Sequence, residues 1–131
     1  MTLQENSLPR RIREYIAGHL SEDLTVNQLL RQFQISRSKL FRISSTFFGA
    51  GIEQTIRTER IHKAKDLLAS TPLSIGKISA TVGYRDEHYF CKVFKKHVGV
   101  TPIQYRKQRW EKLLYEDQSA KNPAAIARKS K

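Results

Sequence analysis

Two short stretches of the sequence place polar and basic side chains directly after a residue that can cap a helix. The capping residues are Ser36 and Asp86, about 50 residues apart, a spacing at which an internal repeat reuses one supersecondary unit. The side chains that follow them outside the apolar stripe are suited to contacts with the edges of DNA bases. These candidates are Arg37, Ser38, Phe41 and Arg42 in the first stretch, and Glu87, His88, Cys91 and Lys92 in the second.

Each polar candidate has a chemistry that fits one kind of base contact. Arg42 and Lys92 can donate to guanine O6 and N7, and Glu87 can accept from cytosine N4. Cys91 or the ring of His88 can meet a thymine methyl group. The alternative for all of them is a solvated polar face of a helix.

Phe41 is an apolar residue on a face that otherwise points outward. It either contacts a thymine methyl group or packs between two parts of the fold, because an aromatic ring suits both surroundings. We expect the contact with DNA.

A second set of hydroxyl and basic side chains is better suited to phosphates. Phosphate contacts position a protein on nucleic acid, and the free N–H groups at helix starts add to them. Together these side chains set affinity rather than sequence choice. The predicted phosphate contacts are Ser36, Lys39, Arg57, Lys95, Lys96, Arg106 and Lys107.

The elements that position these residues repeat one plan. From Thr25 to Phe48, and again from Ser74 to Val98, a capping residue starts a short helix, and a turn leads to a second capped helix with basic residues. Gly83 can take the left-handed conformation that ends a helix. This is the helix-turn-helix pattern, whose second helix enters the DNA major groove. The chain therefore contains two such units.

Helices are also predicted before and between the two units. Apolar residues from Arg10 to Leu20 recur at helical spacing, and Ser7 or Pro9 can start that helix. Ile52 to Ser70 forms the longest predicted helix, which spans about 28 Å, comparable to the ~34 Å between successive major grooves. The proline of Thr71-Pro72 ends it.

After the second unit, Thr101-Pro102 starts a last helix. Tyr105 and Trp110 are expected to help cover the core. Gln118 to Lys131 lacks a sustained apolar stripe, so much of it is predicted to be mobile.

Composition narrows the function classes. The chain has 131 residues and a formal net charge of +12, which suits one compact unit or two small subdomains and favours a nucleic-acid partner. With Cys91 as the single cysteine, no internal disulfide is possible, and no apolar run approaches about 20 residues, so we expect a cytoplasmic protein without a membrane partner. His88 and Cys91 alone are too few for a zinc site. We expect no metal, no cofactor and no enzyme activity.

Several motifs in the second half of the chain match one family. They are a helix from Arg60 to Leu68, an Ile-x-x-x-Val-Gly-aromatic turn from Ile78 to Tyr84, Tyr89-Phe90, Phe94-Lys95-Lys96, Gly99, Thr101-Pro102 and Tyr105-Arg106. On these residues the chain resembles the DNA-binding domain of the AraC/XylS family of bacterial transcription regulators, from about Arg11 onward. The resemblance implies a domain of seven helices with two recognition helices in successive major grooves. It also implies promoter binding, activation through RNA polymerase and, in many relatives, a separate N-terminal effector or dimerisation domain.

The first unit departs from the family pattern at three positions. Ser44 stands where an aromatic core residue is usual, Leu30 where a small residue is usual, and Gln34 where glycine often makes the turn. We expect Phe47 or Phe48 to fill the space beside Ser44. A marked rise in stability on Ser44→Phe would instead indicate an unfilled space.

The sequence thus predicts an all-α fold with two helix-turn-helix subdomains joined by a long linker helix. The predicted divisions are a linker end or added start at residues 1–8, the first subdomain at 9–51, the linker helix at 52–70, the second subdomain at 71–112, and a basic, partly mobile tail at 113–131. The predicted function is sequence-specific binding of promoter duplex DNA. The alternative is a protein-interaction module or an architectural module that binds DNA without sequence choice.

Overall fold

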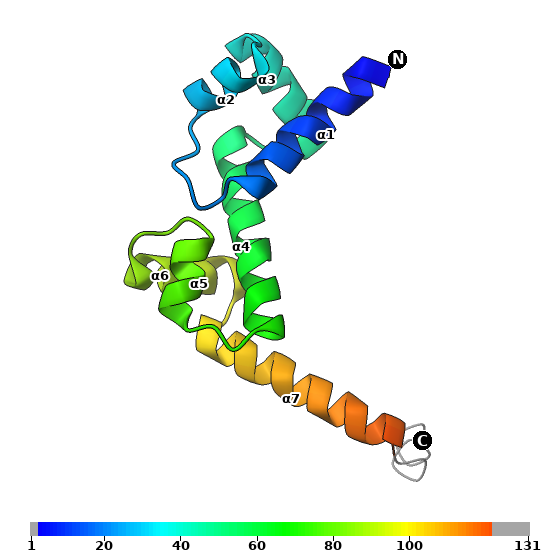
Figure 1. Cartoon of the computed structure of the whole chain (residues 1–131), viewed down its shortest axis with the longest axis vertical. Coiled ribbons are helices and arrows are strands. Elements are labelled where there is room, and N and C mark those ends of the chain that lie inside the picture. Colours follow the sequence, from blue (N-terminus) through cyan, green and yellow to red (C-terminus); the bar gives the residue numbers. More distant parts are fainter. Residues whose placement is uncertain (1–2, 122–131) are drawn as a thin grey trace.

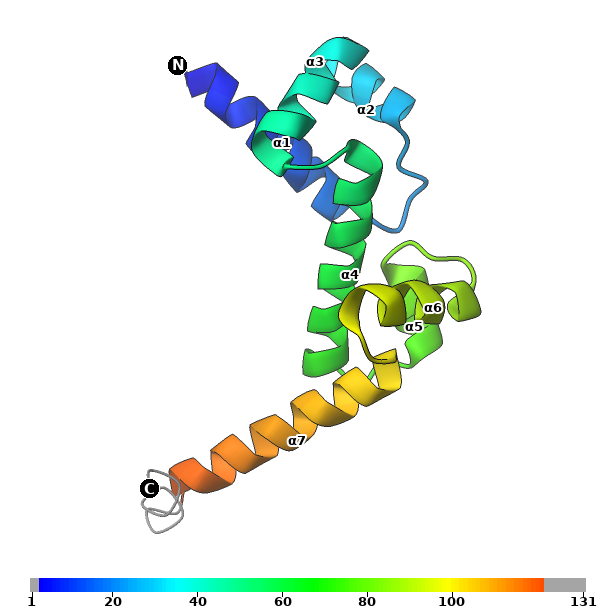
Figure 2. The same cartoon turned by 180° about the vertical axis from the view of Figure 1, so that it is seen from behind.

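The computed structural model describes the backbone of residues 3–121 and the side chains of residues 7–116. This part of the chain contains seven α-helices and no strand. The helices form two lobes joined by one long helix, α4 (Figures 1 and 2). The predicted all-α fold with two helix-turn-helix units is therefore confirmed. No helix in the described range is both long and apolar enough to cross a membrane.

The first lobe is built on the start of α4. Its elements are α1 (Leu3–Gly18), α2 (Val26–Phe33), α3 (Arg37–Ile43), the π-helical turn η1 (Ser44–Phe48) and the first half of α4 (Ile52–Ser70). Its core is aliphatic and includes Ile12, Ile16 and Leu29, which are fully buried. The predicted caps are present, since Thr25 Oγ1 accepts from Gln28 N at 3.1 Å and Ser36 Oγ accepts from Lys39 N at 3.1 Å.

The second lobe packs against the other half of α4. Its remaining elements are α5 (Ile75–Thr81), α6 (Glu87–Val98) and α7 (Pro102–Lys121). Here the core is aromatic, because Phe90 lies 5.4 Å from the ring of Tyr84 and 5.8 Å from that of Phe94. Tyr105 adds an edge-on contact to Phe94 at 5.7 Å, so its predicted role in covering the core is confirmed.

The π-helical turn accommodates Ser44 in the first core. Ser44 is 2% exposed, and its hydroxyl donates to the Leu40 carbonyl at 2.8 Å. A π-turn adds a residue to the helical ring and shifts the side chains that follow it. Phe48 packs against the first core, whereas Phe47 is 44% exposed. Of the two residues expected to fill the space beside Ser44, Phe48 is therefore the one that packs against the core.

The outer helices are longer than the sequence indicated. Helix α1 begins at Leu3 and contains Pro9, although Ser7 or Pro9 was the predicted start. Leu8 packs on the first core and Pro9 is buried, so the apolar stripe continues into the segment predicted to be a linker end. Helix α7 continues past 112 to Lys121, through residues predicted to begin the tail. The remainder of the predicted mobile segment, residues 122–131, lies outside the described range.

Candidate nucleic-acid interface

Helix α3 turns one face into the first core and leaves the other in solvent. Leu40 and Ile43 are buried. The predicted base-contact residues Arg37, Ser38 and Arg42 are exposed. Phe41 is 72% exposed, so it does not pack between the lobes. An apolar ring with this exposure is available to a partner.

The first turn of α3 is basic and partly ordered by neighbouring groups. One terminal nitrogen of Arg37 donates to Asn27 Oδ1 on α2 at 2.8 Å, which directs the guanidinium along α2. Ser36 uses its hydroxyl to cap the helix, and Lys39 is exposed. The first turn of α3 contains no acidic residue, so the positive end of the helix dipole adds to the side-chain charge.

In helix α6, the candidate residues follow the cap Asp86 at the same positions at which those of α3 follow Ser36. Asp86 Oδ1 accepts from His88 N at 2.9 Å, while Phe90, Val93 and Phe94 face the core. Of the predicted base-contact residues, Glu87, His88 and Lys92 are exposed and Cys91 is half-buried against the second core. His97, near the end of the same helix, is exposed as well.

Two of these side chains are less free than their sequence positions indicated. The Glu87 carboxylate leans onto α5, since its Oε1 would lie only 2.6 Å from a Cβ added at Gly76. Burial, and next the negative charge of Glu87, raise the pKa of the Cys91 thiol above its ordinary value. Cys91 therefore presents a neutral thiol at neutral pH.

Two exposed residues near the start of α6 were missed as candidates. Tyr89 is 58% exposed and follows its cap by as many positions as Lys39 follows Ser36. The repeat register alone was enough to identify it. Arg85 precedes the cap, and one of its terminal nitrogens donates to Asp23 Oδ2 at 2.7 Å. That partner lies 62 positions away and has no local sequence signature.

Most predicted phosphate contacts are on the surface, but one is not. Lys39, Lys95, Lys96 and Lys107 are exposed, as is Ser36. Arg106 is partly buried, where its Nε donates to the Leu68 carbonyl and its terminal nitrogen to the Thr71 carbonyl, both at 3.0 Å. Arg106 thus satisfies free carbonyls at the end of α4 and stacks on Trp110 at 5.2 Å. These bonds occupy two of the guanidinium nitrogens, and the predicted phosphate contact of Arg106 stays a prediction.

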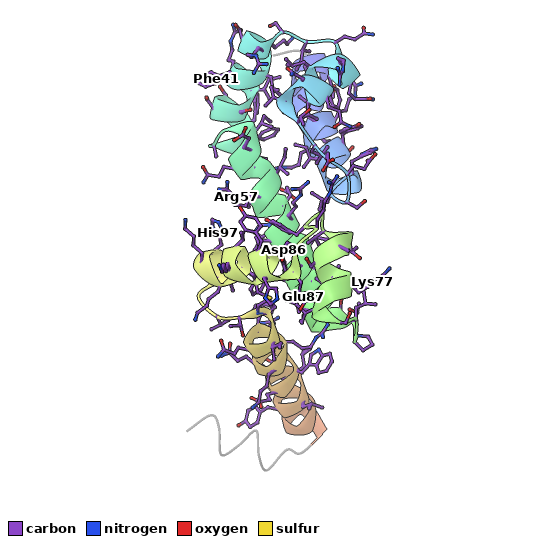
Figure 3. The ribbon with its side chains drawn as sticks, turned by 90° about the vertical axis from the view of Figure 1, so that its left-hand side faces the viewer. Phe41, Arg57, Lys77, Asp86, Glu87 and His97 are labelled. Carbon is purple, nitrogen blue, oxygen red and sulfur yellow. The ribbon has the colours of Figure 1, made fainter. Side chains whose placement is uncertain are left out.

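An open cleft of about 660 Å³ lies between the two lobes. Arg57 and Arg60 on α4 line it, together with Tyr84, Arg85 and Tyr89 from the second lobe. Burial raises the pKa of Tyr84, although the nearby positive charges of Arg60 and then Arg57 oppose this shift. In Figure 3, Phe41 on α3, Arg57 on α4 and Glu87 at the start of α6 follow one another along the length of the molecule.

The titratable side chains do not converge on a metal-like site. Within the described residues, His, Cys, Asp and Glu form no group of three or more that could hold a metal ion. His88 and Cys91 lie three positions apart on α6, and among the described residues they belong to no such group. Instead, α3, α4 and α6 carry exposed hydrogen-bonding and positively charged side chains.

Comparison with known proteins agrees with this arrangement. A family profile described as "Helix-turn-helix domain" matches residues 29–108, which include all the motifs from Arg60 to Arg106. The chain belongs to the AraC/XylS family. The xylose operon regulatory protein of Escherichia coli K12 is 40% identical over 100 residues, which cover 76% of this chain and 26% of that protein.

Solved AraC/XylS domains share the fold. The C-terminal domain of AraT, a response regulator from Geobacillus stearothermophilus, is 39% identical with a TM-score of 0.71, over 77% of this chain and 84% of that one. The DNA-binding domain of AdpA, solved in complex with a target DNA, has a TM-score of 0.69 at 22% identity, over 88% of this chain and 96% of that one. The present chain is thus a helix-turn-helix domain of DNA-binding transcription regulators. Its match spans about a quarter to a third of the length of the curated relatives.

Proposed function

We propose that this chain binds duplex DNA at specific sequences, with α3 and α6 in successive major grooves, and thereby regulates transcription. The observation that carries the proposal is the repeated arrangement of two capped helices with exposed starts, joined by a single linker helix. The 19 residues of α4 span about 28 Å, comparable to the ~34 Å between major grooves on one face of B-DNA. The AdpA domain, which shares this fold, was solved in complex with a target DNA, and this supports binding of DNA.

In this proposal the two helices divide the base contacts. Arg42 donates to a guanine, and Phe41 covers a thymine methyl group, because its ring is largely exposed. On α6, His88 and Lys92 are the freest candidates, while Glu87 and Cys91 must turn slightly from their resting contacts. Phosphate contacts come from exposed basic side chains, namely Lys39, Arg57, Lys95, Lys96 and Lys107.

We further propose that the chain activates transcription and that another domain controls this activity. The family resemblance implies activation through contact with RNA polymerase at promoters in the bacterial cytoplasm. It also implies that a separate effector-binding or dimerisation domain accompanies this one in many relatives. The match to only part of the length of the curated relatives supports this view.

Selection of bound sites from a random duplex library tests the proposal. We expect two short boxes about one helical turn apart, and a competition titration should then favour the selected duplex over random duplex by about 10³-fold or more at fixed salt. Equal affinity for both duplexes would contradict sequence-specific binding.

A protein-interaction role is the second candidate, and exposed apolar side chains on α7 favour it. Ile103 is 67% exposed, Leu114 64% and Leu113 48%. A contiguous exposed apolar patch is typical of docking surfaces. This role predicts that Leu113→Ser with Leu114→Ser leaves the titration against selected duplex unchanged. Parity of selected and random duplex would make it the main function.

A further inference from the structure

The two lobes touch each other directly, beside the helix that joins them. The loop after α1 meets the turn before α6, and the two loops lie next to each other in Figures 1 and 2. A Cβ added at Gly83 would lie 2.0 Å from the Leu20 carbonyl oxygen and 2.8 Å from Arg60 Nε. Gly83 also has a φ of +101°. Glycine is therefore required here both by conformation and by the close approach of the first lobe.

Arg60 joins both loops from the middle of α4. Its terminal nitrogen donates to the Glu22 carbonyl at 3.0 Å, in the loop of the first lobe. Its guanidinium lies 5.7 Å from the centre of the Tyr84 ring, in the turn of the second lobe. Its Nε is buried next to Gly83. One side chain thus contacts both lobes where their backbones approach each other.

A second link between the lobes is much weaker. Arg85 and Asp23 form an ion pair at 2.7 Å, but their side chains are 86% and 78% exposed. Exposed ion pairs contribute little, because solvent screens the charges and two long side chains must be ordered. We call the contact between the loop after α1 and the turn before α6 the seam. The packing around Arg60 and Gly83 is therefore the part of the seam that can resist movement of the lobes.

We propose that Arg60, packed against Gly83, fixes the angle between α3 and α6 at the separation that α4 sets, so that the protein accepts its two DNA boxes at one spacing only. This inference rests on the proposed function. One added base pair moves the second box by about 3.4 Å and turns it by about 34°. A fixed seam cannot follow that displacement, whereas two lobes linked by α4 alone can. Arg60 is then a positioning residue, which sets spacing without touching a base.

The test is a set of duplexes in which the two selected boxes stand at the selected spacing or one base pair closer or farther apart. The native protein should lose about tenfold or more in affinity at either altered spacing, because one box is then lost. Arg60→Met removes the bond to Glu22 and the contact with Tyr84. It should bind the selected spacing less tightly but lose less than about threefold on altering it. The same spacing penalty in Arg60→Met as in the native protein would overturn the inference.

Arg57→Met is the matched control, since it removes the same charge one turn earlier on α4 from an exposed position. It should lower affinity for all three duplexes by the same factor. A relaxed spacing preference in Arg57→Met would assign the effect to charge and would also overturn the inference. If Arg60→Met fails to fold, as judged by its circular dichroism, Arg60→Lys replaces it, because lysine keeps the charge but lacks the planar fork.

A second measurement does not depend on DNA. Spin labels at Gln32→Cys on α2 and Ala80→Cys on α5, both exposed sites, report the distance between the lobes when Cys91 is replaced by serine. The distance distribution should be narrow in the otherwise native protein and broader with Arg60→Met. Equal widths would contradict the inference and leave the proposed function intact. A native protein that binds without any spacing preference would instead contradict the proposed function itself.

Discussion

In α3 and α6 the candidate base contacts stand at the same positions after the cap, but the two helix starts differ in charge. Helix α3 begins with Arg37, Ser38 and Lys39 and has no acidic residue in its first turn. Helix α6 begins with Asp86 as its cap and Glu87 as its first residue. Because carboxylates are repelled by phosphates, the start of α6 can approach DNA closely only where a base offers a donor. We infer that α3 supplies more of the affinity and α6 more of the discrimination.

The interiors of the two lobes differ as well. The first core is aliphatic, uses a π-helical turn around Ser44 and places Gln34 in the left-handed conformation, with φ of 52°. The second core contains aromatic rings in tilted and edge-on contact, and glycine occupies its left-handed turn. A side chain in this conformation costs about 1 kcal/mol, whereas glycine adopts it freely. The second lobe is therefore the more regular of the two.

The largest expected effect is on the aromatic core of the second lobe. Phe90→Ala removes a fully buried ring that contacts two others, and we expect it to lower the free energy of unfolding by about 3–5 kcal/mol. Urea denaturation measures this. Lys92→Ala, on the exposed face of the same helix, should change it by less than about 0.5 kcal/mol. A smaller loss for Phe90→Ala than for Leu40→Ala, its counterpart in α3, would reverse our ranking of the two cores.

A second prediction concerns the π-helical turn of the first lobe. Ser44 is buried and Phe48 already packs against the same core, so Ser44→Phe should overpack this core and destabilise the protein by about 1–3 kcal/mol. The double variant Ser44→Phe with Phe48→Ala exchanges the position of the ring and should lose less than the sum of the single variants. Stabilisation by Ser44→Phe would show that the first core contains an unfilled space after all.

Arg42→Ala probes base recognition by α3. We expect it to lower affinity for the selected duplex by about 1–3 kcal/mol and to relax the choice at one base pair. Site selection with the variant identifies that position. Lys96→Ala is the control on α6, because it should weaken all sequences alike and reduce the slope of affinity with salt by about one. Similar losses on selected and random duplex for both variants would remove the distinction between base and phosphate contacts.

Glu87→Gln tests the acidic start of α6 and is expected to have a smaller effect. Removing the negative charge should strengthen binding to random duplex by about 0.5–1 kcal/mol, while binding to the selected duplex gains less. The ratio of the two affinities should therefore fall. Lys39→Gln is the matched change at the start of α3, and it should weaken both. An unchanged ratio for Glu87→Gln would place discrimination elsewhere than at the start of α6.

The sequence was sufficient wherever a local interaction decides the structure. Thr25, Ser36 and Ser74 cap the helices as predicted, and α4 has its predicted bounds, because caps and a following proline act over only a few residues. The inward turn of Arg106 depended on carbonyls 35 and 38 positions earlier. The π-helical turn lies where Ser44 is buried and Phe48 packs against the first core. Neither has a local pattern.

The smallest predicted effect is a loss of stability at alkaline pH, mainly from the second lobe. Burial raises the pKa of both Cys91 and Tyr84 in the folded protein. In the unfolded chain the thiol loses its proton at about pH 8.5 and the phenol at about pH 10, while the folded protein still holds both protons. The unfolded state then binds fewer protons, so stability is fully present below these values and falls as the pH rises through them. Thermal unfolding at pH 7.5 and 9.5 should show a smaller fall for Cys91→Ser than for the native chain. An equal fall in both would mean that the thiol titrates alike in the folded and unfolded states, and that Cys91 is open to solvent on α6 as Arg42 is on α3.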